Sequence, residues 1–111
     1  MSKVRAVGVS EERLLELHRA ILLPRLIEEK MLNLLRQGRL SKWFSGIGQE
    51  AIAVGVASAL EPTEWILPMH RNLGVFTTRG VVLGRLLRQL LGRDGGFTKG
   101  GDRTFHLGDL S

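Results

Sequence analysis

Large apolar side chains recur every three or four residues between positions 14 and 35, and this period constrains the fold more than any other feature. The positions are Leu14, Leu17, Ile21, Leu22, Leu26, Met31, Leu34 and Leu35. Apolar residues at this spacing form one face of an α-helix. Ser10 before two glutamates is a typical helix start and Gly38 a typical stop, so we predict a helix over about 10–37. Pro24 removes a backbone donor inside this stretch, so we expect it to kink the helix or split it in two.

Shorter helices are predicted downstream, over about 48–60, 70–79 and 82–91. In the first of them, Ala51, Gly55 and Ala59 recur at every fourth position. Small side chains on one face let another backbone approach closely, so we expect this helix to be buried. Residues 65–67 before Pro68 are expected to form a short strand. The loop over 39–47 is expected to expose two aromatic side chains, Trp43 and Phe44.

The two ends of the chain lack a helical period. Residues 1–9 are expected to form a flexible arm, and the glycine-rich stretch 92–111 a loop that becomes ordered against another surface. The sequence therefore predicts a single partial domain over 10–111, mainly α, that ends in a glycine-rich loop.

Composition excludes several classes of protein. The chain of 111 residues has no cysteine, which rules out disulfides and thiolate metal sites and fits a reducing cytoplasm. We find no signal sequence and no apolar run near the roughly 20 residues that a membrane span needs, so we expect a cytoplasmic protein without a membrane segment. The net charge of +5 leaves nucleic-acid binding open, but the arginines are scattered at helical spacing, which is typical of solvated helix faces.

Three short blocks carry the residues best suited to chemistry: residues 48–51 (GQEA), 69–72 (MHRN) and 99–106 (KGGDRTFH). Arg71 stays charged and presents fork-shaped donors that match phosphate oxygens, although a surface ion pair would also explain it. Histidine is a common proton donor and acceptor in enzymes, so His106 could act in proton transfer or stay idle in solvent. The three histidines share no ligand spacing, so we expect no metal site on this chain.

The order of these blocks resembles the N-terminal part of the α subunit of thiamine-diphosphate-dependent 2-oxo acid dehydrogenases. These are the E1 components of the pyruvate, branched-chain 2-oxo acid and acetoin dehydrogenase complexes. The resemblance covers about residues 10–108, yet only about the first third of an α subunit. It implies that these helices belong to an α/β thiamine-diphosphate-binding fold.

The resemblance also implies roles for individual residues. His70 and Arg71 match the Tyr-Arg pair that contacts the cofactor's diphosphate, with His70 in place of tyrosine and Asn72 in place of the usual acid. His106 matches a histidine near the reacting carbonyl and is the implied catalytic residue. The implied substrate-binding residues are Trp43 and Phe44, in the loop that shapes the acyl pocket, and Arg103, which could bind a substrate carboxylate.

Part of the family's cofactor machinery has no counterpart here. The Gly-Asp-Gly string and distant asparagine that hold Mg²⁺ are absent, so the Mg²⁺ ligands are expected on another chain or segment. The implied partners are the remainder of the α subunit, a β subunit and a lipoyl acyltransferase core. The implied reaction is thiamine-diphosphate-dependent oxidative decarboxylation of a 2-oxo acid with acyl transfer to a lipoyl carrier.

Two other interpretations stay open: a non-catalytic helical interaction or regulatory module derived from this family, and a basic nucleic-acid-binding helical protein. Because a chain this short cannot cover all of its leucines, we also expect an oligomer. We expect the isolated chain to be catalytically inert.

Overall fold

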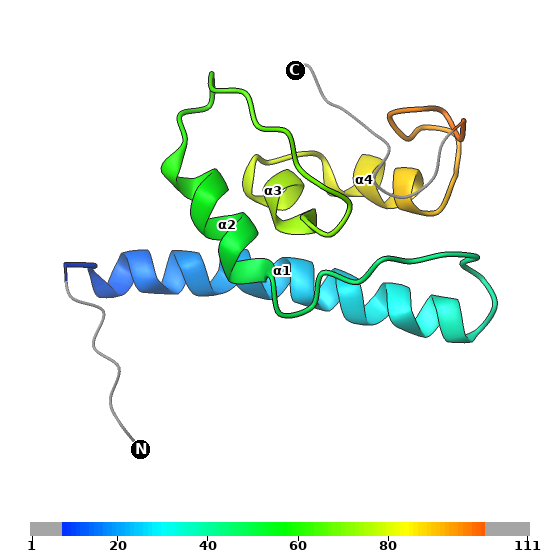
Figure 1. The fold of residues 1–111 in the computed structure, drawn as a ribbon, viewed down its shortest axis with the longest axis horizontal. Coiled ribbons are helices and arrows are strands. Elements are labelled where there is room, and N and C mark those ends of the chain that lie inside the picture. The colour runs from blue at the N-terminus through cyan, green and yellow to red at the C-terminus, as the bar shows by residue number, and fades with distance from the viewer. Residues whose placement is uncertain (1–7, 102–111) are drawn as a thin grey trace.

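The computed structural model describes residues 8–101, which form four α-helices and no β-strand (Figure 1). The helices are α1 (Glu11–Arg36), α2 (Glu50–Ala59), α3 (Leu73–Thr78) and α4 (Leu83–Leu90). They lie inside the four predicted ranges and are shorter than predicted. The prediction of a mainly α chain is confirmed, whereas the predicted strand at 65–67 is wrong. Those residues belong to an irregular loop in which Trp65 is 79% and Leu67 89% exposed, with no neighbouring strand to pair with.

Helix α1 begins where the capping pattern predicts. The Ser10 hydroxyl accepts a hydrogen bond from the Arg13 backbone N–H at 3.2 Å, which satisfies one of the free donors of the first turn. The helix then continues through Pro24 without a break, so the second of the two expected outcomes, division into two helices, does not occur. Pro24 is buried, and the packing of this face offsets the backbone hydrogen bond that the ring removes.

The end of α1 is a Schellman motif. Gly38 has a left-handed backbone (φ 72°) and donates to Leu35 O, while Arg39 N–H donates to Leu34 O at 2.9 Å. A left-handed conformation at this position is favourable for glycine because it has no Cβ. The motif turns the chain back along α1 and directs residues 40–47 over its C-terminal half (Figure 1).

Helix α2 packs against both α1 and α3 through an unexpected face. Its buried residues are Glu50, Ala53, Val54 and Ala57, whereas Ala51, Gly55 and Ala59 are all exposed. The prediction that these three small residues form the buried face is therefore wrong. The glycine that lets two helices approach closely is instead Gly74 of α3. A Cβ on Gly74 would lie 3.1 Å from the Val54 side chain of α2.

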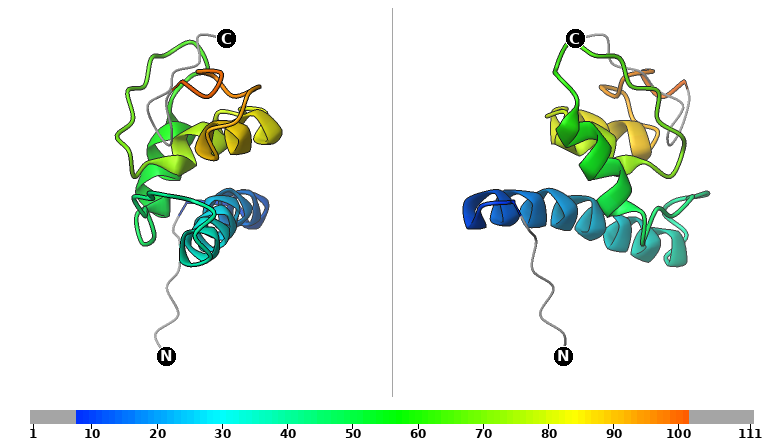
Figure 2. Two further views of the ribbon diagram at one scale, coloured as in Figure 1. Left: turned by 90° about the vertical axis from the view of Figure 1, so that its right-hand side faces the viewer. Right: turned by 60° about the vertical axis from the view of Figure 1, so that its left-hand side comes forward.

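One apolar core joins α1, α3, α4 and the loop after α1. Its buried residues are Ile27, Met31, Leu34, Leu40, Trp43, Leu73, Phe76, Leu86 and Leu90. Helix α1 lies along one side of the molecule, with α2, α3 and α4 all on the other side of it (Figures 1 and 2). The inward face of α1 is consequently buried and its outward face is open to solvent.

Candidate functional site

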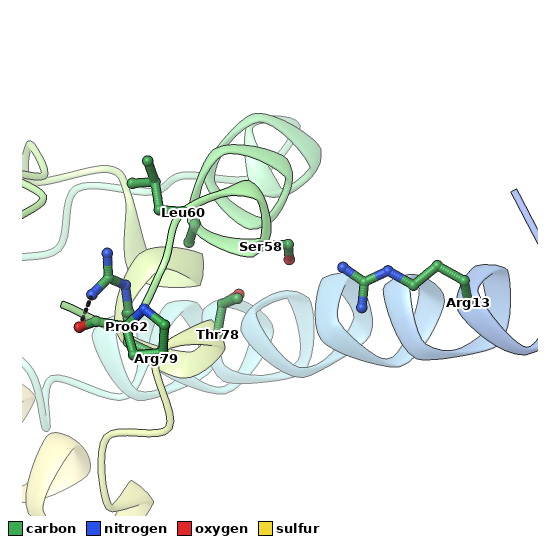
Figure 3. A pocket seen from close by; sticks show the side chains of 7 residues that line it. Arg13, Ser58, Leu60, Pro62, Thr78 and Arg79 are labelled. Atoms are coloured by element: carbon green, nitrogen blue, oxygen red, sulfur yellow. Dashed lines mark hydrogen bonds between the residues drawn. The ribbon is translucent and has the colours of Figure 1, made fainter. Parts of the chain in front are cut away.

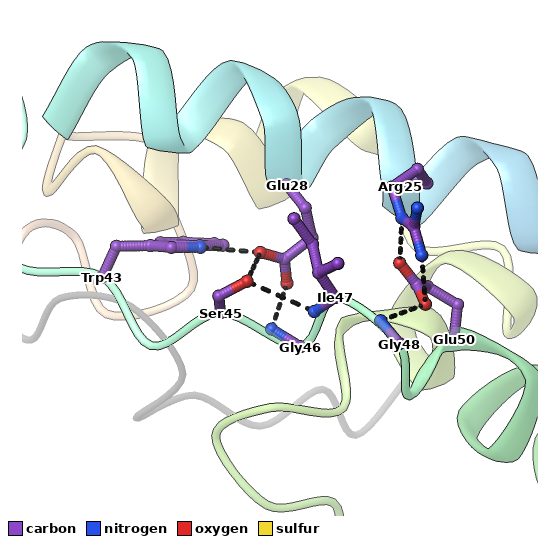
Figure 4. Close-up of polar contacts among 8 residues, drawn as sticks. All are labelled: Arg25, Glu28, Trp43, Ser45, Gly46, Ile47, Gly48 and Glu50. Atoms are coloured by element: carbon purple, nitrogen blue, oxygen red, sulfur yellow. Dashed lines mark hydrogen bonds and ion pairs between the residues drawn. The ribbon is translucent and has the colours of Figure 1, made fainter. Parts of the chain in front are cut away.

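The loop between α1 and α2 is held by one buried carboxylate, that of Glu28, which is 1% exposed (Figure 4). Its Oε2 accepts from the Trp43 indole N–H at 2.7 Å and from the Ser45 hydroxyl at 3.2 Å, and its Oε1 accepts from Gly46 N–H at 2.9 Å. A buried carboxylate is costly unless hydrogen bonds replace its lost hydration, and three donors supply them here. The side chain of Glu28 therefore fixes the path of residues 43–46.

The segment before α3 lies directly against this loop. A Cβ on Gly46 would come within 2.2 Å of the Arg71 carbonyl oxygen, so only glycine permits this backbone contact. The Arg71 side chain returns to the same place, where its Nη1 donates to Ser45 O at 2.6 Å. Two segments about 25 residues apart in sequence are thus joined at one point.

The guanidinium of Arg71 remains available to a ligand. The residue is exposed, and the bond to Ser45 O uses one of its five N–H donors. No other hydrogen bond or ion pair of this side chain lies within residues 8–101. A guanidinium that is tethered at one corner and open to solvent elsewhere can bind an anion at little cost in side-chain entropy.

His70 and Phe44 extend this surface. Their ring centroids are 4.8 Å apart with the planes tilted by 58°, a favourable geometry for aromatic contact. Lys42 Nζ lies 5.0 Å from the centre of the Phe44 ring on the same loop. Both rings are half-buried, so the arrangement combines apolar surface with the positive charges of Lys42 and Arg71.

Trp43 takes a different position from its neighbour. We expected Trp43 to be exposed, but it is 8% exposed and belongs to the apolar core, with its indole N–H bonded to Glu28. Its predicted contact with substrate stays a prediction. Arg103 and His106 lie outside the described residues, so their predicted roles stay predictions as well.

An ion pair anchors the start of α2 beside the loop (Figure 4). Arg25 Nε and Nη2 donate to the two carboxylate oxygens of Glu50 at 2.5 and 3.2 Å, and Gly48 N–H donates to Glu50 Oε2 at 2.8 Å. The hydrogen bonds from Arg25 are the main reason that the pKa of Glu50 lies below its ordinary value. The N-cap position of α2 belongs to Gln49, and the carboxylate of Glu50 accepts the hydrogen bond of Gly48 N–H.

Sequence reasoning missed Glu28, Arg25 and Gly46. A usable signal existed for Glu28, because it lies at helical spacing between Pro24 and Met31 on the inward face of α1. A lone carboxylate on an apolar face indicates a buried polar contact. Nothing in the local pattern marks Gly46, since its requirement comes from a carbonyl 25 residues further along the chain.

A separate pocket of about 300 Å³ lies where α2 and α3 end (Figure 3). Arg13, Ser58, Thr78 and Arg79 contribute its polar groups. Arg79 Nη1 and Nη2 donate to Pro62 O and Glu64 O, and Arg13 pairs with Glu16. Helix C-termini carry partial negative charge, which these arginines offset. Arg79 thus meets carbonyl oxygens and no carboxylate, and its Nε and the Thr78 Oγ1 are buried without a hydrogen-bond partner among the described residues.

Residues 8–101 contain neither a membrane-spanning helix nor a cluster of metal ligands. No helix in the stretch 8–101 is both long and apolar enough to cross a bilayer. The same stretch contains no group of three or more histidine, aspartate or glutamate side chains placed to hold a metal ion.

Comparison with known proteins supplies the family. The sequence model described as "Dehydrogenase E1 component" matches residues 18–109, most of the chain. The chain belongs to the dehydrogenase E1 component family. The resemblance to the N-terminal part of an E1 α subunit is thereby confirmed.

Individual relatives are α subunits of 2-oxo acid dehydrogenases. The chain is 38% identical over 76 residues to 3-methyl-2-oxobutanoate dehydrogenase subunit alpha of Mycobacterium tuberculosis, covering 68% of this chain and 21% of the relative. It is 33% identical over 102 residues to 2-oxoisovalerate dehydrogenase subunit alpha 2 of Arabidopsis thaliana, covering 92% of this chain and 22% of the relative. It is 35% identical over 89 residues to pyruvate dehydrogenase E1 component subunit alpha of Acholeplasma laidlawii, covering 80% of this chain and 26% of the relative.

The chain thus spans about a quarter or less of the length of these relatives. The names of these relatives differ in substrate: 3-methyl-2-oxobutanoate or 2-oxoisovalerate for two of them, and pyruvate for the third. The comparisons therefore place the chain in the E1 α subunits without choosing a 2-oxo acid.

Proposed function

We propose that this chain forms one wall of the thiamine diphosphate and 2-oxo acid site of an E1 component. The other walls would come from the remainder of an α subunit and from a β subunit. One observation carries the proposal: Arg71 is fastened to Ser45 O while most of its guanidinium faces solvent. This contact supports the proposal, because the arginine expected to bind the diphosphate then lies beside the loop expected to shape the acyl pocket.

The residues present suit an anionic cofactor. Arg71 would donate to diphosphate oxygens, and His70, held by the Phe44 ring, would donate beside it. Phe44 would offer apolar surface to the acyl chain, while Trp43 would keep the loop in place through Glu28. The Mg²⁺ ligands would lie on another segment or chain, as would the rest of the α/β fold.

Residues beyond the described range complete the proposal. His106 would act at the reacting carbonyl, and Arg103 would bind the substrate carboxylate. When bound, thiamine diphosphate would supply the carbanion chemistry of oxidative decarboxylation, with the acyl group passing to a lipoyl carrier on an acyltransferase core. The protein's contribution is to position these groups and exclude competing reactions.

Cofactor binding tests the proposal directly. The chain would be produced together with a β subunit and the remaining α segment, and titrated with thiamine diphosphate and Mg²⁺ in a calorimeter. We expect Arg71→Ala to weaken binding at least tenfold and Arg39→Ala, an exposed loop arginine, to leave it unchanged. Equal affinities for both variants would overturn the assignment of Arg71.

The isolated chain provides a second readout. We expect no turnover of any 2-oxo acid by the 111-residue chain alone with cofactor, and turnover would refute the one-wall proposal. An assembly that forms normally yet never binds thiamine diphosphate would favour the alternative, a non-catalytic interaction module.

A further inference from the structure

The pocket where α2 and α3 end is lined by hydrogen-bond donors for which the described chain supplies few acceptors. Its polar side chains are Arg13, Ser58, Thr78 and Arg79. Each of them can donate a hydrogen bond, and among the described residues no carboxylate or amide side chain lines the pocket to accept one. Its volume of about 300 Å³ is at the lower end of the range in which proteins bind small molecules.

The hydroxyl of Thr78 is the clearest sign of a missing ligand. Its Oγ1 is buried and forms no hydrogen bond with any atom of residues 8–101. The preceding residue shows the usual solution in a helix, because the Thr77 hydroxyl donates to Gly74 O at 3.3 Å. A buried polar group without a partner costs free energy, and a ligand oxygen would supply that partner without breaking an existing hydrogen bond. Figure 3 shows the hydroxyls of Thr78 and Ser58 on the side of the pocket toward Arg13.

Arg79 brings a charge that no carboxylate of the described chain neutralises. Its Nη1 and Nη2 donate to Pro62 O at 3.1 Å and to Glu64 O at 2.8 Å, and both acceptors are neutral carbonyls. The Glu64 carboxylate accepts from Glu61 N–H at 2.6 Å and does not line the pocket. The C-termini of α2 and α3 offset part of the charge, but the partial charge at a helix end is smaller than that of a guanidinium.

Arg13 reaches the pocket from α1 and is only weakly paired. Its Nη1 donates to Glu16 at 2.9 Å, and the two side chains are 48% and 65% exposed. This bond uses one of the five N–H donors of the guanidinium. Exposed ion pairs contribute little to stability, so a ligand can compete with Glu16 for Arg13.

We propose that this pocket binds a small organic carboxylate. The carboxylate oxygens would accept hydrogen bonds from the Arg13 guanidinium and from the two hydroxyls, with the charge of Arg79 beside them. A short carbon chain would lie against the apolar part of the lining, which consists of Ala57, Leu60 and Pro62. A bare phosphate or sulfate ion would leave these three side chains in water, so the apolar wall favours an organic acid.

The pocket is separate from the candidate cofactor site. Helix α2 begins at Glu50 beside the loop 43–46, and α3 begins at Leu73, just after Arg71. The pocket lies at the opposite ends of both helices (Figure 3). The inference therefore does not rest on the proposed function, and a variant of Arg71 can tell the two sites apart.

Titration of the isotopically labelled 111-residue chain with butyrate, followed by NMR, tests the proposal. At low ionic strength we expect saturable shifts of the Ser58 and Thr78 amides, with a Kd of about 1–10 mM for so small a ligand. Butyramide has a similar shape without the charge and should bind about fivefold more weakly or less. Absence of saturable shifts at these amides, or equal affinity for the two compounds, would overturn the proposal.

Substitutions in and outside the pocket locate the bound carboxylate. Arg13→Gln and Thr78→Val should each raise the Kd for butyrate about fivefold or more. Arg19→Gln, which removes another exposed arginine of α1, and Arg71→Ala should leave the Kd unchanged. Unchanged binding by Arg13→Gln or Thr78→Val would overturn the proposal. Loss of binding in Arg71→Ala alone would assign butyrate to the candidate cofactor site and overturn it as well.

Two further measurements separate a ligand site from a merely structural one. Thr78→Val replaces a hydroxyl that has no partner, so its midpoint of unfolding in urea should not fall below that of the wild type. Glu16→Gln should lower the Kd for butyrate, because it frees the Arg13 guanidinium and removes a negative charge beside the pocket. A lower unfolding midpoint for Thr78→Val, or weaker binding by Glu16→Gln, would overturn the proposed contacts.

Discussion

The Trp43 indole N–H donates to the Glu28 carboxylate across 2.7 Å, and this contact connects the middle of α1 to the loop that carries Phe44. Both side chains are almost fully buried. The same carboxylate also accepts hydrogen bonds from the Ser45 hydroxyl and from Gly46 N–H. A single side chain therefore holds the loop that the proposed site requires.

Removing this carboxylate should destabilise the chain strongly. Glu28→Ala removes the acceptor of three hydrogen bonds, and we expect the free energy of unfolding to fall by about 2–4 kcal/mol in urea titrations. Glu29→Ala, at the exposed neighbouring position, should change it by less than about 0.5 kcal/mol. A loss of similar size in both variants would show that Glu28 does not hold the loop.

Acid should weaken the Arg25–Glu50 pair. The pKa of Glu50 is lowered in the folded chain, chiefly by its hydrogen bonds from Arg25, so the folded state favours the ionised form. This contribution to stability is complete above the ordinary value of 4.5 and is lost as the pH falls below 4.5 toward the lower folded-state pKa. Urea titrations at several pH values should show that the free energy of unfolding falls less for Glu50→Gln than for the wild type over that interval. An equal fall in both proteins would contradict this prediction.

Local signals explain how much of the fold could be predicted. Ser10 and Gly38 act within one turn of the ends of α1, so its limits followed from neighbouring residues. The face of α2 could not be predicted in this way. Ala51, Gly55 and Ala59 had the right spacing, but burial depends on where Gly74 meets Ala53 and Val54, and those contacts join residues about 20 apart.

In the candidate site, too, some features follow from neighbouring residues and others from contacts between distant parts of the chain. Arg71 was identified because a guanidinium in a family block suggests a phosphate ligand, and the structure places it on the surface beside the expected loop. Trp43 was assigned to the surface because aromatics in a loop often lie there, while its hydrogen-bond partner Glu28 is 15 residues away. Contacts at such distances follow from the packed chain and not from a residue's neighbours.

Gln89 should control the loop that follows α4. Its Oε1 accepts from both the backbone N–H and the hydroxyl of Thr98, at 3.0 and 3.1 Å, and the residue is 1% exposed. Gln89→Leu removes the acceptor of both hydrogen bonds, so we expect a loss of about 1–3 kcal/mol and faster proteolysis within residues 92–101. Thr98→Val keeps the backbone bond and should have a smaller effect. Equal proteolysis of both variants would argue against this anchor.

Gly46 should tolerate no side chain, because a Cβ there would lie 2.2 Å from the Arg71 carbonyl oxygen and 3.2 Å from Glu28 Oε1. Gly46→Ala must move one of the two joined segments, and we expect it to cost about 2–4 kcal/mol of stability. Gly55→Ala is the matched control: it adds the same methyl group in α2, where no atom beyond the adjoining helix backbone lies within 4 Å, and should stabilise the chain by about 0.5–1 kcal/mol. Urea titrations would measure both changes. Destabilisation by Gly55→Ala and not by Gly46→Ala would contradict the close approach of Gly46 and Arg71, on which the proposed site depends.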